Sequence, residues 1–277
     1  MVCKNHQRLV TVCLMLLFMI LLCGTAWALL DDLAWPEASG EARQTADKLT
    51  VDYSHADLGY VMVHGPSTDK RLKLRVNCNG MELQYDINGK EEWEIIPLQF
   101  GEGTYTFSLF LGAGGNKYQS GGKMTVSAKF GNPNAAYLMP NQYVYYDKDT
   151  PAVAKSEEIC EGLTTDQEKF DAIRAYIKEN YVYDFVKANS ALPAGTLPSV
   201  EYVWNSGMGI CQDLAALAAC MLRVQGIPTR LDIGHVGGNY YHAWNSVIIN
   251  GQLIQYDPTA DVSSIPLDMG YRLERYY

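Results

Sequence analysis

Basic residues are scarce in this chain of 277 residues. It contains 22 lysine and arginine residues against 31 aspartate and glutamate residues, and its formal net charge at pH 7 is −9. Proteins that bind nucleic acid or an anionic membrane surface usually present a positive face to the phosphate groups. The acidic balance therefore argues against both kinds of partner, and we expect no nucleic-acid partner.

Cysteine pairs at metal-binding spacing are also missing. The seven cysteines are scattered, without a C-x-x-C pair, which argues against a zinc site. So few cysteines in a chain of this length also argue against a disulfide framework. The sequence has no acidic loop with the spacing of a calcium site. We therefore expect no cofactor and no bound metal.

Residues 1–28 have the pattern of a secretory signal peptide. Lys4 and Arg8 precede an uncharged apolar stretch that ends in Ala26-Trp27-Ala28. The alternative is an uncleaved membrane anchor, because the apolar run is long enough to span a bilayer. Cleavage after Ala28 would leave 20 basic and 31 acidic residues, a net charge of −11. We expect a secreted or cell-surface protein without membrane contact beyond this segment.

Residues 50–130 have the sequence pattern of an antiparallel β domain. Short runs rich in β-branched and aromatic residues recur at intervals of about ten residues, each bounded by Gly, Asn or Pro. Leu72, Leu74 and Val76 alternate with polar neighbours, as in a strand with one buried face. Asn88-Gly89 is typical of a type I′ hairpin turn. We predict an immunoglobulin-like β-sandwich of about six or seven strands within residues 45–132.

After a Pro/Asn-rich connection at residues 131–150, the sequence pattern becomes typical of helices. Thr165 and Glu168 form a capping-box pattern at the start of one predicted helix. A second predicted helix runs from about Gln212 to Gln225, and strands follow it. This order predicts an α+β domain over residues 150–277.

Cys211 opens the second predicted helix, directly after a glycine-rich turn. Unpaired backbone N–H groups and the helix dipole favour an anion there, and a thiolate is an anion. Gly207 and Gly209 would let a substrate backbone approach closely. A buried structural thiol is the alternative. Cys220 lies about half a turn away around the helix, and we interpret it as a packing residue.

His242 and Asp257 fall on one face of a predicted hairpin. The turn Asn250-Gly251 sets a register in which Trp244 lies opposite Asp257, so His242 becomes a diagonal neighbour of that aspartate. A carboxylate that meets an imidazole fixes its tautomer and stabilises its protonated form. A register error of one residue would place the two side chains on opposite faces.

Three segments in this order, "GICQDLAALAACMLRVQGIPTR", "YHAWNSV" and "YDPT", resemble the transglutaminase-like superfamily. The resemblance covers about residues 150–277 and includes "AIRAYIKENYVYD", but it has no counterpart for residues 30–130. It implies a papain-like domain in which Cys211 is the nucleophile, His242 the general base and acid, and Asp257 the orienting carboxylate. Trp204 and Gln212 are candidates for a side-chain oxyanion donor by proximity only.

The resemblance implies an exported cysteine acyltransferase or an amide or peptide hydrolase that works through a thioester. Its substrate would be a protein or a peptide, with cell-wall peptide among the candidates. The triad does not separate transfer from hydrolysis. One alternative is a non-catalytic protein that uses the same scaffold to bind a surface or cell-wall component. Another is metal binding by the same three residues.

We predict that the exported chain is cleaved after Ala28 and begins at Leu29, because the A-x-A ending is typical of cleavage sites. N-terminal sequencing of the protein recovered from an expressing bacterium tests this. Recovery from the membrane fraction with residues 1–28 intact would identify an anchor instead.

Overall fold

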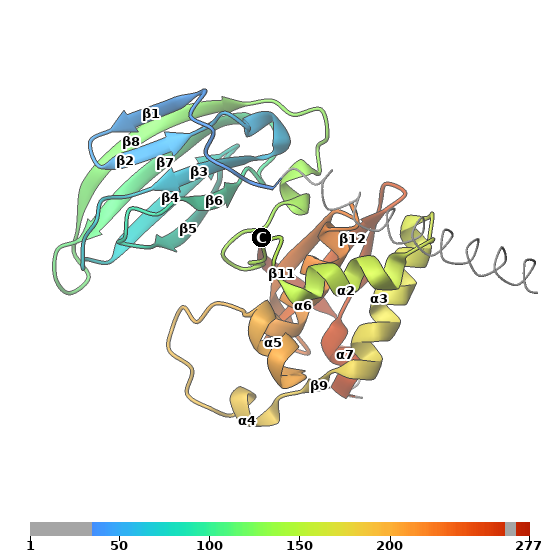
Figure 1. Ribbon diagram of the computed structural model, residues 1–277. Helices are drawn as coiled ribbons and strands as arrows, with labels where there is room; N and C mark the ends of the chain where they lie inside the picture. Colours follow the sequence, from blue (N-terminus) through green and yellow to red (C-terminus); the bar gives the residue numbers. More distant parts are fainter. Residues whose placement is uncertain (1–34, 264–269) are drawn as a thin grey trace, which may run out of the picture.

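The computed structural model describes residues 35–263 and 270–277, and it contains a β-rich half followed by a mixed half of helices and strands (Figure 1). The predicted signal peptide, residues 1–28, lies outside the described residues. Within those described ranges, no helix combines the length and hydrophobicity needed to cross a membrane. The expected α+β class, with β structure first, is confirmed.

Two antiparallel sheets of four strands form the β-rich half. The first sheet, in the order β1-β2-β3-β6, consists of β1 (Arg43–Ala46), β2 (Leu49–Asp52), β3 (Tyr60–His64) and β6 (Glu94–Pro97). The second, in the order β5-β4-β7-β8, consists of β4 (Leu72–Cys78), β5 (Met81–Ile87), β7 (Gly103–Gly112) and β8 (Tyr118–Ala128). The sheets stack as two layers (Figure 1).

The core between these layers follows the predicted alternation. Leu72, Leu74 and Val76 of β4 are buried, and the residues between them are partly exposed. Burial of such a side chain contributes about 1.5–3 kcal/mol relative to leaving it in water. Alternation within β4 thus identified the face that packs against the other sheet.

The prediction of a hairpin turn at Asn88-Gly89 is wrong. Strand β5 pairs with β4 and strand β6 pairs with β3, so the chain crosses from one sheet to the other at this point. The backbone N–H of Asn88 donates to the Glu94 carboxylate at 2.6 Å, and the Gly89 carbonyl accepts from Thr68 N at 2.8 Å. A type I′ turn needs two flanking strands that pair, and this crossing does not supply them.

Helices and a third antiparallel sheet form the second half. The helices are α2 (Pro151–Cys160), α3 (Asp166–Asn180), α4 (Phe185–Ala188), α5 (Val200–Ser206), α6 (Cys211–Arg223) and α7 (Pro258–Ser263). The sheet, in the order β13-β12-β11-β14, consists of β11 (Thr229–Val236), β12 (Tyr240–Ile249), β13 (Gln252–Tyr256) and β14 (Tyr271–Tyr276). The short strands β9 (Val182–Tyr183) and β10 (Met208–Gly209) pair in parallel. Two short 3₁₀ helices, η1 (Ala56–Leu58) and η2 (Ala135–Leu138), precede this half.

Helix α6 is the central element of this half. It contacts β11 and β12 on one side and α2, α3, α5 and α7 on others, and every residue from Asp213 to Arg223 is buried. The predicted helix at 212–225 therefore exists, one residue earlier at its start and two residues shorter at its end. The capping box of α3 is also confirmed, with Thr165 Oγ1 accepting from Glu168 N. The domain boundaries at 45–132 and 150–277 stay predictions.

The Arg223 guanidinium, at the end of α6, ties separate segments together. It is 1% exposed and donates to the backbone carbonyls of Met139 at 2.6 Å, Thr229 at 2.8 Å and Tyr277 at 3.0 Å. Burial lowers its pKa to about 10, so the group is still charged at neutral pH. The Tyr277 ring stacks on Tyr143 with centroids 3.5 Å apart. The connection at 131–150 is thus packed against the second half.

We predict that Arg223→Met lowers the free energy of unfolding by about 3 kcal/mol or more, because it leaves three backbone carbonyls without their charged donor. Urea unfolding followed by tryptophan fluorescence measures this. The exposed Arg272→Met on β14 is the control, with an expected change of at most about 0.5 kcal/mol. Equal losses in the two variants would contradict the role of Arg223.

Candidate active site

Cys211 is the first residue of α6, as predicted. Gly207 adopts a left-handed conformation (φ 69°) that ends α5, and a Cβ on Gly209 would lie only 2.9 Å from Val203 Cγ2. Both glycines therefore serve the tight passage from α5 into α6, and a close approach of substrate at them stays a prediction. This passage places Cys211 at a partly exposed position, although α6 is buried from Asp213 onward.

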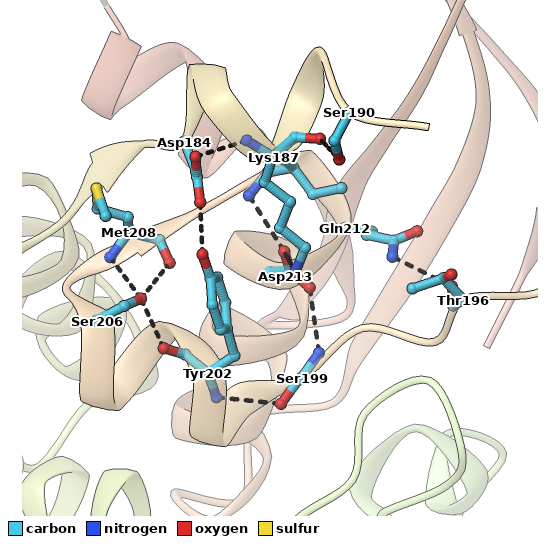
Figure 2. Close-up of polar contacts among 11 residues, drawn as sticks. Asp184, Lys187, Ser190, Thr196, Ser199, Tyr202, Ser206, Met208, Gln212 and Asp213 are labelled. Atoms are coloured by element: carbon cyan, nitrogen blue, oxygen red, sulfur yellow. Dashed lines mark hydrogen bonds and ion pairs between the residues drawn. The ribbon is translucent and has the colours of Figure 1, made fainter. Parts of the chain in front are cut away.

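A buried carboxylate accepts hydrogen bonds at the start of α6. Asp213, 0% exposed, accepts hydrogen bonds from Ile210 N at 3.2 Å and Ser199 N at 3.2 Å, and it pairs with Lys187 Nζ at 2.6 Å. Figure 2 shows the Lys187 side chain extended toward this carboxylate. An acidic residue in the first turn also suits the helix dipole. Asp213 thus joins α4 and the segment before α5 to the helix that carries Cys211.

A second buried aspartate, Asp184, ties the same region together. The Asp184 carboxylate accepts from Lys187 N at 2.8 Å and from the Tyr202 hydroxyl at 2.5 Å (Figure 2). Because both ends of the long connection between α4 and α5 are tied in this way, that connection is held beside Cys211. Neither Asp184 nor Asp213 was predicted from the sequence as a residue of the site. An acidic residue three positions after the N-cap of α6 was the available signal for Asp213.

The two candidates for an oxyanion donor have different surroundings. The Gln212 side-chain amide donates to the carbonyl of Thr196 at 3.2 Å (Figure 2) and lines the same cavity as Cys211. Trp204 lines a separate cavity with Tyr145 and Glu201. Of the pair, therefore, only Gln212 lies at the site, and its amide nitrogen is already engaged.

The hairpin that carries His242 has the predicted register. Residues Asn250 and Gly251 both have positive φ angles, 52° and 74°, and Ile249 pairs with Gln252. His242 Nε2 lies 2.7 Å from Asp257 Oδ2, and the two residues are 7% and 8% exposed. The turn therefore brings together two side chains that are fifteen residues apart.

Asp257 has two further donors. Its Oδ1 accepts from Thr259 N at 2.9 Å, and its Oδ2 accepts from the Tyr271 hydroxyl at 2.9 Å. The Tyr271 ring also packs edge-on against Trp244, with centroids 5.0 Å apart. Sequence reasoning missed Tyr271, because it belongs to β14 at the far edge of the sheet and no local pattern connects it to residue 257. These donors fix the carboxylate that faces the imidazole.

Cys211 and His242 line one cavity of about 470 Å³. Burial disfavours the charged ring of His242, but hydrogen bonds with Asp257 and Cys211 outweigh burial and raise its pKa to about 9. Because Nε2 faces Asp257, Nδ1 is the ring nitrogen left for the sulfur. The structure thus brings together all three residues that the sequence nominated.

The other described cysteines have a different environment. Cys78, Cys160 and Cys220 are free and buried. Burial raises the pKa of Cys160 to about 11 and that of Cys220 further still, so both thiols are protonated and unreactive at neutral pH. Cys220 packs inside the core, as expected.

No metal-ligand cluster is found within the described ranges. Residues 35–263 and 270–277 contain no group of three or more His, Cys, Asp or Glu side chains arranged to hold a metal ion. Cys211, His242 and Asp257 therefore do not form such a group. The imidazole of His242 instead interacts with the thiol on one side and the carboxylate on the other.

We predict that Asp257→Asn lowers the pKa of His242. Burial disfavours the protonated ring, and a neutral amide stabilises its positive charge less than the carboxylate does. In the wild type, the pKa of about 9 exceeds the 6.5 of free imidazole. The protonated ring therefore stabilises the fold fully below pH 6.5, and this contribution disappears as the pH rises through about 9.

Titration of ¹⁵N-labelled histidine by NMR measures both variants, and unfolding at several pH values measures the linkage. Asp261→Asn is the matched control, because that carboxylate pairs with Arg174 at 2.7 Å instead of with a histidine. An unchanged His242 midpoint in Asp257→Asn would contradict the prediction.

Comparison with known proteins gives a family and several distant structural neighbours. A profile of the transglutaminase-like superfamily matches residues 153–258. Among curated proteins, no significant relative was found. The chain is similar to a provisionally assigned cysteine protease from Cytophaga hutchinsonii, with 16% identity, a TM-score of 0.43, and coverage of 79% of this chain and 83% of that one.

Two other solved structures are similar over a smaller share of their own length. A provisionally assigned protease from Parabacteroides distasonis has 14% identity and a TM-score of 0.33, with coverage of 72% of this chain and 37% of that one. Red sea bream transglutaminase has 13% identity and a TM-score of 0.29, with coverage of 72% and 48%. On the strength of the profile match, residues 153–258 form a domain of the transglutaminase-like superfamily, and the resemblance read from the sequence is confirmed.

Proposed function

We propose that this protein is an exported cysteine acyltransferase or amide hydrolase in which Cys211, His242 and Asp257 act as a catalytic triad. One observation carries the proposal: the buried imidazole of His242 interacts with Asp257 at 2.7 Å and with the Cys211 thiol. A thiol, a base and an orienting carboxylate in that order are what nucleophilic cysteine catalysis needs.

The first half of the reaction forms a thioester. His242 takes the proton of the Cys211 thiol, and the thiolate attacks the carbonyl carbon of a bound amide. The backbone N–H of Cys211, at the unpaired start of α6, is directed at the oxyanion that develops. His242 then gives its proton to the leaving nitrogen, the C–N bond breaks, and an amine departs.

Asp257 supports the imidazolium that exists between these two proton transfers. It accepts from Nε2, which holds the ring in one orientation and stabilises its positive charge. The raised pKa of about 9 favours the imidazolium that forms once the ring has taken the thiol proton, so the pair stands as thiolate and imidazolium before the attack. The hydrogen bonds from Tyr271 and Thr259 keep the carboxylate in place.

The second half of the reaction decides the product. Attack of water on the thioester releases a carboxylic acid, which is hydrolysis. Attack of an amine, such as a lysine side chain, gives a new amide, which is transfer. In both cases His242 removes a proton from the attacking group and the thiol is regenerated. We propose a protein or peptide substrate, with cell-wall peptide among the candidates because of the export proposed from residues 1–28.

We predict that iodoacetamide labels Cys211 at least about a hundredfold faster than Cys220 in the folded protein. The labelling rate should depend on pH, and His242→Ala should remove the advantage because it removes the base. Peptide mass spectrometry after timed quenching gives both rates in one sample. Labelling of Cys211 as slow as that of Cys220 would support a non-catalytic binding scaffold.

Product analysis then separates the two reactions. A glutamine peptide is incubated with a lysine peptide or alone, beside simple peptides, and the products are identified by mass. We expect a crosslinked product, a released amine or a cleaved peptide with the wild type. Cys211→Ala should yield none of these, and Cys220→Ala, the matched cysteine control, should retain them. Equal product from Cys211→Ala would contradict the proposal.

A further inference from the structure

The cavity of Cys211 has an uneven charge distribution. Arg275 is the one lysine or arginine among its lining residues in the described part of the chain, and no aspartate or glutamate of that part lines it. Tyr143, Tyr183 and Tyr241 form much of the remaining wall. In a chain with a net charge of −9, a cavity with a single fixed positive charge is a local exception.

Arg275 lies in register with the strand that carries His242. It pairs with Ile233 of β11, which pairs in turn with Ala243 of β12, next to His242. Neighbouring strands are about 4.8 Å apart, so the Arg275 backbone lies roughly 10 Å from that of Ala243. An extended peptide covers this distance in about three residues. All three paired residues line the cavity.

The Arg275 guanidinium lies at the cavity wall, and the two hydrogen bonds described below do not engage all of its N–H donors. One terminal nitrogen donates to the Tyr241 hydroxyl, and the other donates to the half-exposed Glu274 at 2.7 Å. A guanidinium has five N–H donors, so these two bonds leave others free to bind. An exposed ion pair such as that with Glu274 is weak and does not prevent a ligand from binding. The side chain is 32% exposed, which leaves it accessible.

We propose that Arg275 binds a carboxylate of the substrate, within about three residues of the amide bond that Cys211 attacks. This inference rests on the proposed function, because it names the substrate class of the same site. The planar guanidinium matches a carboxylate through two parallel N–H···O bonds. The tyrosine walls accommodate the intervening peptide through apolar and stacking contacts.

The test compares matched peptide pairs. Pools of N-acetyl pentapeptide amides carry one Asp at a defined position, and their partner pools carry Asn there. A second pair compares a free C-terminal carboxylate with a C-terminal amide, so that a side chain and a chain end are distinguished. We expect wild-type kcat/KM to favour the acid in at least one pair by about ten- to a hundredfold.

Two variants of Arg275 and one control complete the kinetic test. Arg275→Gln should abolish the preference by lowering kcat/KM for the acidic peptides, and Arg275→Lys should retain part of it. The matched control is Arg272→Gln, which lies on the same strand but does not line the cavity and should keep the full preference. A preference that survives in Arg275→Gln overturns the proposal. If that variant does not fold, a wild-type ratio near one overturns it.

A readout that needs no turnover separates this inference from the reaction itself. The same peptides are tested for protection of Cys211 against iodoacetamide. Selective protection by the acids, lost in Arg275→Gln, supports the carboxylate site even if neither peptide of a pair is turned over, and only the proposed reaction then fails. Equal turnover and equal protection within every pair leave the reaction standing and overturn the role of Arg275.

Discussion

Helix α6 is buried along its length except at its first turn, and the site depends on this constraint. Its residues from Asp213 onward pack against the sheet on one side and other helices around it, so the helix cannot shift without disrupting the core. The position of the Cys211 sulfur is therefore set by the packing of the eleven residues from Asp213 to Arg223. A partly exposed thiol at the end of such a rigid element is positioned more precisely than one on a loop.

Three buried charged groups of this half are held by partners. Asp213 pairs with Lys187 and accepts from two backbone N–H groups, Arg223 donates to three carbonyls, and His242 meets Asp257. A buried charge without a partner is costly, and a paired one contributes little net stability. We infer that these groups serve mainly to hold segments in one arrangement. Asp213 does so for the cavity wall, and Asp257 does so for the imidazole.

Strand β14 connects the site to the rest of the molecule. Its first residue, Tyr271, donates to Asp257, and Arg275 lines the cavity near its other end. Beyond them, Tyr276 accepts a hydrogen bond from Gln99 of the β-rich half through its carbonyl, and Tyr277 packs against Tyr85. One strand thus contacts the triad, the substrate cavity and the neighbouring sheets.

The sequence by itself determined the local features and one distant pair. Capping at Thr165, the start of α6 at Cys211 and the turn at Asn250-Gly251 all depend on neighbouring residues, and the turn set the register that joins His242 to Asp257. Only the tertiary structure decided the crossing at Asn88 and the contact of Tyr271 with Asp257, together with the place of Arg275 in the cavity. The physical reason is that a two-residue turn fixes which residues pair in the two strands that it joins. Strand partners far apart in sequence are chosen instead by the burial of whole faces, which no short stretch encodes.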